Sequence, residues 1–142
     1  MSLLSELYVS SATEATKYDD TPEPFAPYRA EYQGLTSEEF ANLWAVLCDR
    51  EPMESDVDAF DTLLNVDDGQ RLINRFPDDF VTRLADLSEH DLESVAQKWV
   101  QHGELSFMEC RPSDAMPILE SLRNLANVAV KEQKLLCLWM CV

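Results

Sequence analysis

The segment 135–142, LLCLWMCV, constrains the fold more than any other feature, because it contains no polar side chain. Side chains of a β-strand alternate between the two faces of a sheet. The even-numbered residues from Leu136 to Val142 would point to one face and the odd-numbered ones from Leu135 to Cys141 to the other. We predict a buried strand with helices on one face and another layer, or a second subunit, on the other. An exposed tail would leave Trp139 and several leucines in water, at about 2 kcal/mol per large side chain.

Two other segments are candidate partners for this strand. Residues 7–11, LYVSS, have the composition of a short strand. Residues 70–76 follow a turn-like DDG, which favours a strand, although Leu72, Ile73 and Phe76 also fit one turn of helix. The sheet should therefore be small.

Two helices are indicated by start signals. In GLTSEEFANLWAVL, Thr36 is placed to cap a helix over 37–49, and Glu39 can reach back to the cap. In DLSEHDLESVAQKWVQHG, Ser88 is placed in the same way, and Gly103 suits a left-handed C-terminal cap. Each helix carries one apolar stripe at helical spacing, namely Phe40, Leu43, Trp44 and Leu47 in the first and Leu92, Val95, Ala96 and Trp99 in the second.

Three further helices follow from the same rules. Ser55 could cap a short helix with Val57, Phe60 and Leu64 facing inward. Pro77 suits the first turn of the next helix. Asp114 could cap the last and longest one, which places Pro117 at its third position, where no intrahelical N–H bond is lost.

These elements predict an α+β fold dominated by helices, with about four to five helices packed on a small sheet that includes the C-terminal strand. Only three glycines are present among 142 residues, which disfavours barrels and sandwiches with many tight turns. The length suits a single globular domain over 1–142. The stretch 21–28, TPEPFAPY, has three prolines and is expected to cross the surface.

The formal net charge of −16 limits the classes of partner. It argues against nucleic acids and anionic membrane surfaces, which carry the same sign. The acidity is concentrated in residues 1–68, with sixteen acids and three bases. Residues 49–68 alone hold eight acids and one base, so this stretch is the predicted binding surface.

The sequence therefore favours a small acidic interaction protein, of the inhibitor or immunity type, that binds a basic protein partner. The residues assigned to partner binding are Glu54, Asp58, Asp61, Asp67 and Asp68. A small-molecule binder or enzyme whose site leaves no sequence motif is the alternative. A homodimer with an isologous interface is also expected, because a strand with two apolar faces can be covered by a second copy.

No motif assigns a catalytic, cofactor-binding or metal-binding residue, and we expect no cofactor. An EF-hand beginning at Asn65 fails, because its twelfth residue is Phe76 instead of Glu. Cys137 and Cys141 would lie about 13 Å apart on one strand face, so they read as buried apolar residues. His90 and His102 would lie about 18 Å apart along a helix and could not share a site. The scattered cysteines and an opening without a signal-peptide pattern predict a cytoplasmic protein.

The order of elements in the second half resembles that of an uncharacterised family of small acidic bacterial proteins. The resemblance rests on RFPDDFVTRLADLSEHDLESVAQKWV, a long helix and LLCLWMCV, over about residues 70–142. It implies a bacterial cytoplasmic protein of unknown role. It transfers no functional residue to this chain.

Overall fold

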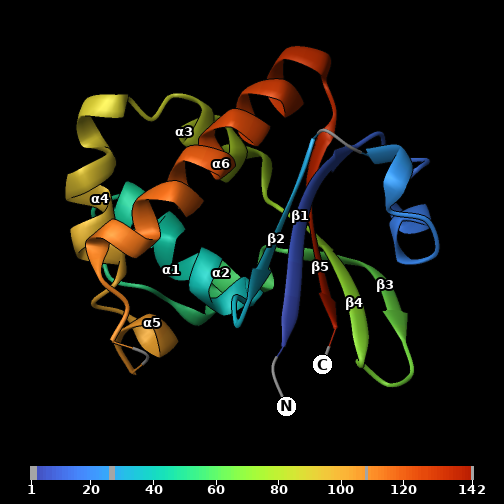
Figure 1. The fold of residues 1–142 in the computed structure, drawn as a ribbon, viewed down its shortest axis with the longest axis horizontal. Coiled ribbons are helices and arrows are strands. Elements are labelled where there is room, and N and C mark those ends of the chain that lie inside the picture. The colour runs from blue at the N-terminus through green and yellow to red at the C-terminus, as the bar shows by residue number, and fades with distance from the viewer. Residues whose placement is uncertain (1–2, 26–27, 108, 142) are drawn as a thin grey trace.

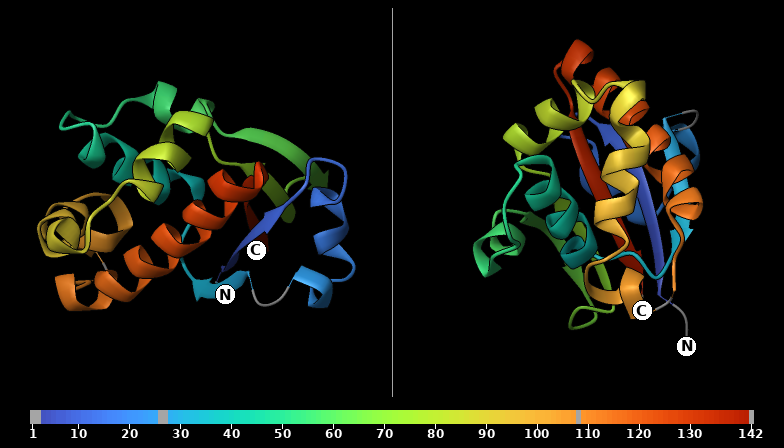
Figure 2. Two further views of the ribbon diagram at one scale, coloured as in Figure 1. Left: turned by 90° about the horizontal axis from the view of Figure 1, so that it is seen from above. Right: turned by 90° about the vertical axis from the view of Figure 1, so that its left-hand side faces the viewer.

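A computed structural model describes residues 3–25, 28–107 and 109–141. These residues form an antiparallel sheet of five strands in the order β2-β1-β5-β4-β3, with the α-helices on one face and a short crossing segment on the other (Figures 1 and 2). The strands are β1 (Leu4–Ser10), β2 (Arg29–Gln33), β3 (Asp61–Val66), β4 (Arg71–Arg75) and β5 (Leu135–Cys141). The predicted helix-dominant α+β class, with the C-terminal strand in the sheet, is confirmed.

Strand β5 occupies the middle of the sheet, which explains why both of its faces are apolar. It pairs with β1 from Leu4↔Cys141 to Ser10↔Leu135, and with β4 over residues 71–75. Leu136 and Leu138 point toward the helices and are at most 1% exposed. On the opposite, outer face, Cys137 is buried and Trp139 half-buried. The strands predicted at 7–11, 70–76 and the C-terminus are all present.

The α-helices are α1 (Ser37–Leu47), α2 (Glu54–Asp58), α3 (Asp78–Ala85), α4 (Leu92–Trp99), α5 (Gly103–Phe107) and α6 (Pro112–Glu132). The long α6 packs against β1, β5, α3 and α4, and so ties the helical layer to the sheet (Figure 1). In the described part of the chain, no helix has both the length and the apolar character needed to span a membrane.

Of the predicted caps of the two amphipathic helices, the one at Thr36 is confirmed, and those at Ser88 and Gly103 are wrong. The Thr36 hydroxyl accepts a hydrogen bond from the Glu38 N–H, and the Glu39 carboxylate accepts one from the Thr36 N–H at 3.2 Å. Ser88 precedes a short 3-10 helix, η3 (Glu89–Asp91), and its hydroxyl donates to the Asp91 carboxylate at 2.8 Å instead of accepting a backbone N–H. Helix α4 ends at Trp99 with Val100 as its cap, so Gly103 begins α5 instead of capping α4. The stripe of α4 is buried, and the indole Nε1 of Trp99 donates to the Glu39 carbonyl at 2.8 Å, joining α4 to α1.

The predicted short helix capped by Ser55 is wrong in its start and its extent. Helix α2 begins at Glu54, and the Asp56 carboxylate accepts a hydrogen bond from the Met53 N–H at 2.8 Å. Leu64, expected on that helix, belongs to β3, which pairs with β4 and has a register irregularity between Thr62 and Leu64. The spacing of the apolar residues suits a helix, but pairing across the 67–70 turn gives β3 residues on both sides of this irregularity, Leu64 among them, partners on β4.

The start of the last helix was also misplaced. Helix α6 begins at Pro112, and Asp114 is its third residue, whose carboxylate accepts a hydrogen bond from the Arg111 N–H at 3.1 Å. Proline is favoured at a first helical position, where the missing N–H has no intrahelical partner. Pro117 is therefore the sixth residue, and the ladder lacks the bond from position 117 to the Ser113 carbonyl.

The outer face is partly covered by residues 11–25, which we call the crossing segment. It contains two short 3-10 helices, η1 (Ala15–Asp19) and η2 (Glu23–Phe25). The ring of Tyr18 stacks on that of Tyr8 from β1, with centroids 3.9 Å apart. The second apolar layer predicted for β5 is thus supplied, at this end of the sheet, by the chain itself. Of the predicted surface crossing at 21–28, residues 26–27 lie outside the described residues.

Candidate functional site

The loop that carries most of the acidic stretch is fixed by one ion pair. The Arg50 guanidinium donates to both carboxylate oxygens of Asp56, at 2.8 and 2.6 Å. The Asp56 side chain is only 4% exposed, and the hydrogen bonds from Arg50 hold the pKa of its carboxyl below the usual value. Arg50 also lies over the Trp44 ring, 5.9 Å from its centroid. Asp56 and Arg50 therefore fix the loop, and their opposite charges neutralise each other.

Beside this loop lies a hollow of about 430 Å³, which we call the acidic hollow. Its walls come from the first half of α1 and from α2 with the two residues before it, and both helices lie on the helical side of the sheet (Figure 2). The lining residues are Glu38, Asn42, Pro52, Met53, Glu54, Val57 and Asp58. Three of them are exposed carboxylates, and Met53 is 53% exposed.

The charged side chains that line the acidic hollow are all negative. None of its described lining residues is basic, and Glu38, Glu54 and Asp58 form no ion pair within the described part of the chain. Elsewhere in the described part of the chain, six of the eleven basic side chains form ion pairs with acids, namely Lys17, Arg29, Arg50, Arg71, Arg75 and Lys134. A cationic side chain could rest its aliphatic stem on Met53 and present its charge to the carboxylates.

The structure brings together only part of the predicted binding set. Glu54 and Asp58 line the acidic hollow, and Asp61 is exposed at the start of β3. Asp67 and Asp68 are exposed in the β3–β4 turn, at the far end of a strand about 20 Å long. Both have positive φ, and Asp67 pairs with Arg71 at 3.4 Å. The role of these five acids in binding stays a prediction.

Sequence reasoning missed two residues of the hollow. Glu38 is an acid in the first turn of α1, a position that the helix dipole alone explains. Met53 was not singled out, although a large apolar side chain between Pro52 and Glu54 in so acidic a stretch is a usable signal. Met53 adjoins α2 in the chain, but the proximity of Glu38 to α2 depends on the packing of α1 against α2, which no local pattern encodes.

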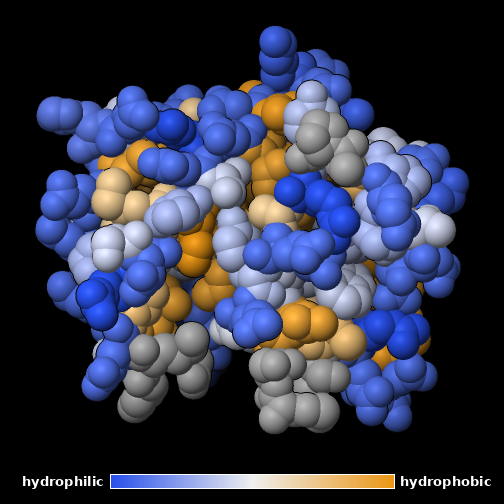
Figure 3. Space-filling model, viewed as in Figure 1, coloured by the Kyte–Doolittle hydropathy of each residue, from blue (hydrophilic) through white to orange (hydrophobic). Residues whose placement is uncertain are grey.

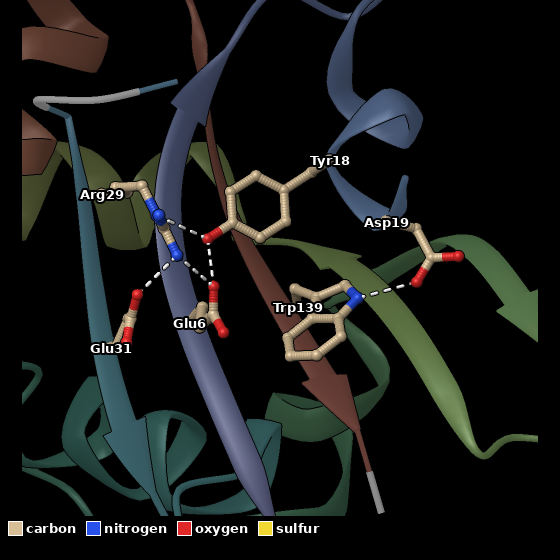
Figure 4. A network of polar contacts seen from close by, with 6 residues as sticks. All are labelled: Glu6, Tyr18, Asp19, Arg29, Glu31 and Trp139. Atoms are coloured by element: carbon tan, nitrogen blue, oxygen red, sulfur yellow. Dashed lines mark hydrogen bonds and ion pairs between the residues drawn. The ribbon is translucent and has the colours of Figure 1, made fainter. Parts of the chain in front are cut away.

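A second polar cluster lies on the outer face, where the crossing segment meets the sheet (Figure 4). Arg29 of β2 donates to the Glu6 and Glu31 carboxylates at 2.7 Å each, and to the Tyr18 hydroxyl at 3.0 Å. The Tyr18 hydroxyl in turn donates to Glu6. The cluster therefore ties η1 to both β1 and β2.

A neighbouring contact fastens the other side of η1. The Asp19 carboxylate accepts hydrogen bonds from the Trp139 indole Nε1 and from the Arg71 Nε, both at 2.9 Å. Figure 4 shows Trp139 lying between Asp19 and the Tyr18 ring. With 8% exposure, the Asp19 carboxylate is nearly enclosed. The two clusters hold the crossing segment at both edges.

The tyrosine hydroxyls and the cysteine thiol of this layer stay protonated at neutral pH. Burial raises the pKa values of Tyr8 and Tyr18 above the ordinary tyrosine value. Burial also raises the pKa of the Cys137 thiol to about 12, so it is not a nucleophile at pH 7. The Tyr8 hydroxyl donates to the Ala15 carbonyl and the Tyr18 hydroxyl to the Glu6 carboxylate. These contacts fasten the crossing segment to the sheet, which is a structural role.

The two histidines are far from both clusters. His90 is exposed in η3, and His102 is half-buried just after α4. Among the described residues, no three or more His, Cys, Asp or Glu side chains are grouped so that they could hold a metal ion.

Comparison with protein-family models, with curated proteins and with solved structures found no match to this chain. The resemblance of residues 70–142 to an uncharacterised family therefore stays a prediction.

Proposed function

We propose that this protein is an interaction protein, of the inhibitor or immunity type, that binds a basic protein partner through the acidic hollow. The observation that carries the proposal is the combination of three exposed carboxylates with an exposed methionine in one concave place. An acidic surface that serves only solubility does not need an exposed apolar side chain at its centre. A binding surface needs both, because apolar contact supplies affinity and complementary charge supplies orientation.

The chemistry of the hollow fits an arginine or lysine side chain of the partner. Met53 and Val57 offer apolar contact to its methylene groups, and a carboxylate pair such as Glu54 and Asp58 offers acceptors to its head group. The excess of acids over the whole chain, 27 against 11 bases, would speed the encounter with such a partner.

The binding chemistry can be tested with a probe that models the partner's side chain. We would titrate isotopically labelled protein with N-acetylarginine amide and record backbone amide NMR spectra. The neutral isostere N-acetylcitrulline amide is the matched ligand control. We expect changes in amide chemical shift that are concentrated at Met53, Glu54 and Val57 and that occur only with the arginine compound. These changes should become smaller as salt is added.

Two variants with the same change in charge locate the effect. Glu38→Gln, Glu54→Gln and Asp58→Asn together neutralise the hollow, whereas Asp61→Asn, Asp67→Asn and Asp68→Asn neutralise the remaining acids of the predicted set. The first triple variant should abolish the localised shifts, and the second should leave them within twofold of the wild type. Shifts spread evenly over all acidic segments, or equal losses in both variants, would show that the charge serves only solubility.

A further inference from the structure

The edge strand β2 has backbone groups that face away from the sheet. On its inner side, the Val9 N–H donates to the Tyr28 carbonyl at 3.1 Å, and the Gly34 N–H donates to the Leu3 carbonyl at 2.9 Å. Backbone groups alternate along a strand, so the even-numbered residues bond to β1 and the odd-numbered ones point outward. The N–H and C=O groups of Arg29, Glu31 and Gln33 therefore line the open edge.

The two edges of the sheet differ in how they are protected. At the other edge, β3 has a register irregularity between Thr62 and Leu64, and such bulges discourage further pairing. The described residues of β2 contain no bulge and no proline. Within the described part of the chain, β2 ends the sheet and pairs with β1 alone, and in Figure 3 apolar residues surface along the seam between α6 and this side of the sheet. Tyr28, next to β2, is 44% exposed.

The sequence of this edge is complementary to itself. If two β2 strands pair antiparallel about a two-fold axis at Ala30, Arg29 of each copy lies opposite Glu31 of the other. On the opposite face, Tyr28 of each copy lies opposite Tyr32 of the other, and the small Ala30 residues meet at the axis. The outward-facing Arg29 and Glu31 form the hydrogen-bonded pairs in this register, so about four backbone bonds are made.

We propose that β2 is the interface of a homodimer, in which two copies of this chain pair edge to edge and form one continuous sheet. Opposite charges and aromatic rings placed directly across strands are the pairs that stabilise antiparallel sheets. The Glu31 side chain is 67% exposed and so can share its carboxylate between both Arg29 residues. A basic strand of another protein would bind this edge less favourably than a second copy does, because Arg29 would repel its charge.

The net charge of −16 on each copy opposes this association. Salt screens that long-range repulsion, while the backbone bonds and ring contacts are short-ranged. Dimerisation should therefore strengthen as salt is raised. In light scattering at high protein concentration, the mass should rise from 16.2 kDa toward twice that value. A monomer mass throughout, in low and in high salt at millimolar concentration, would overturn the proposal.

Cysteine cross-linking tests the register. In this arrangement Ala30 forms a non-hydrogen-bonded pair with itself, with Cα atoms about 4.5 Å apart, which is within disulfide range. Ala30→Cys should form a covalent dimer under mild oxidation. Gln33→Cys, on the same strand, should not, because its two copies would lie about 20 Å apart. Equal cross-linking of the two variants would contradict this register.

Proline substitution tests the backbone bonds, and Glu31→Ala, which removes the same carboxylate but keeps the N–H, separates their effect from that of the side chain. Glu31→Pro removes an outward N–H and spares the bonds to β1, as proline is accepted on edge strands. Gln33→Pro is the matched control, since Gln33 lies outside the paired core. Of these variants, only Glu31→Pro should weaken the dimer by at least tenfold in dissociation constant, with the circular dichroism of all of them unchanged. The dimer edge and the acidic hollow use different residues, so either proposal can fail alone.

Discussion

Replacing Leu138 by Ala tests whether β5 holds the two layers together. Leu138 is fully buried, points toward the helices from the middle strand, and lies between Leu7 of β1 and Asn74 of β4. Neighbours on both sides restrict collapse of the cavity, so the cost should be about 3 kcal/mol, within the ~2–5 kcal/mol range for buried leucines. That is a large part of a total stability of ~5–15 kcal/mol. The melting temperature should fall by about 10 °C.

The assay is urea denaturation followed by tryptophan fluorescence, together with a thermal melt by circular dichroism. The control is Leu4→Ala, the same chemical change at the end of β1, where the side chain is 42% exposed. This variant should lose less than about 1 kcal/mol. If Leu138→Ala cost no more than Leu4→Ala, the middle position of β5 would not be the source of stability.

Four more outcomes follow from the described contacts. Deleting residues 138–142 should abolish cooperative unfolding, because it removes the second half of the strand that joins β1 to β4; an unchanged thermal midpoint would show this segment to be a dispensable tail. Asp56→Asn should cost about 1–3 kcal/mol at neutral pH, since hydrogen bonds to a charged group are lost. Pairing lowers the pKa of Asp56, so its contribution is complete above the unfolded-state pKa and vanishes as pH falls through the folded one; the melting curves of variant and wild type should converge in acid. Burial raises the pKa of Glu39, so ionisation of this carboxyl above its unfolded-state pKa lowers the stability of the fold. Glu39→Gln should therefore leave stability at pH 7 unchanged or higher. A loss as large as that of Asp56→Asn would refute this assignment. Under native conditions, iodoacetamide should modify the buried Cys137 at least tenfold more slowly than the half-buried Cys48, as measured by mass spectrometry, and equal rates would contradict the burial of Cys137.

The parts of the fold that sequence predicts well are those with local or unambiguous signals. A run apolar at every position has one good place in a small sheet, the middle, and β5 lies there. The Thr36 and Glu39 capping pair is a contact within four residues, and its helix was correctly placed. By contrast, Val57, Phe60 and Leu64 have helical spacing, yet α2 ends at Asp58 and Leu64 belongs to β3, where pairing with β4 across the turn determines the structure.

The candidate site was harder to foresee because it is assembled from two helices. Composition drew attention to the stretch 49–68, yet it could not separate Asp56, which is enclosed by Arg50, from Glu54 and Asp58, which face the solvent. Nor could it bring Glu38 of α1 to α2. The open edge of β2 was equally invisible, since strand order is a property of the folded sheet.

The position of β5 also determines how the protein can reach its native state. Strands β1 and β2 form one two-stranded ribbon and β3 and β4 another, and β5 is their only common neighbour in the sheet. An isolated two-stranded ribbon is marginally stable in water. The pairing of Leu4 with Cys141 spans nearly the whole chain, and such long-range contacts slow folding. During synthesis, the two ribbons therefore cannot join into one sheet until β5 has been made. A chain stalled before residue 135 would expose the unpaired edges of β1 and β4 to chaperones and proteases.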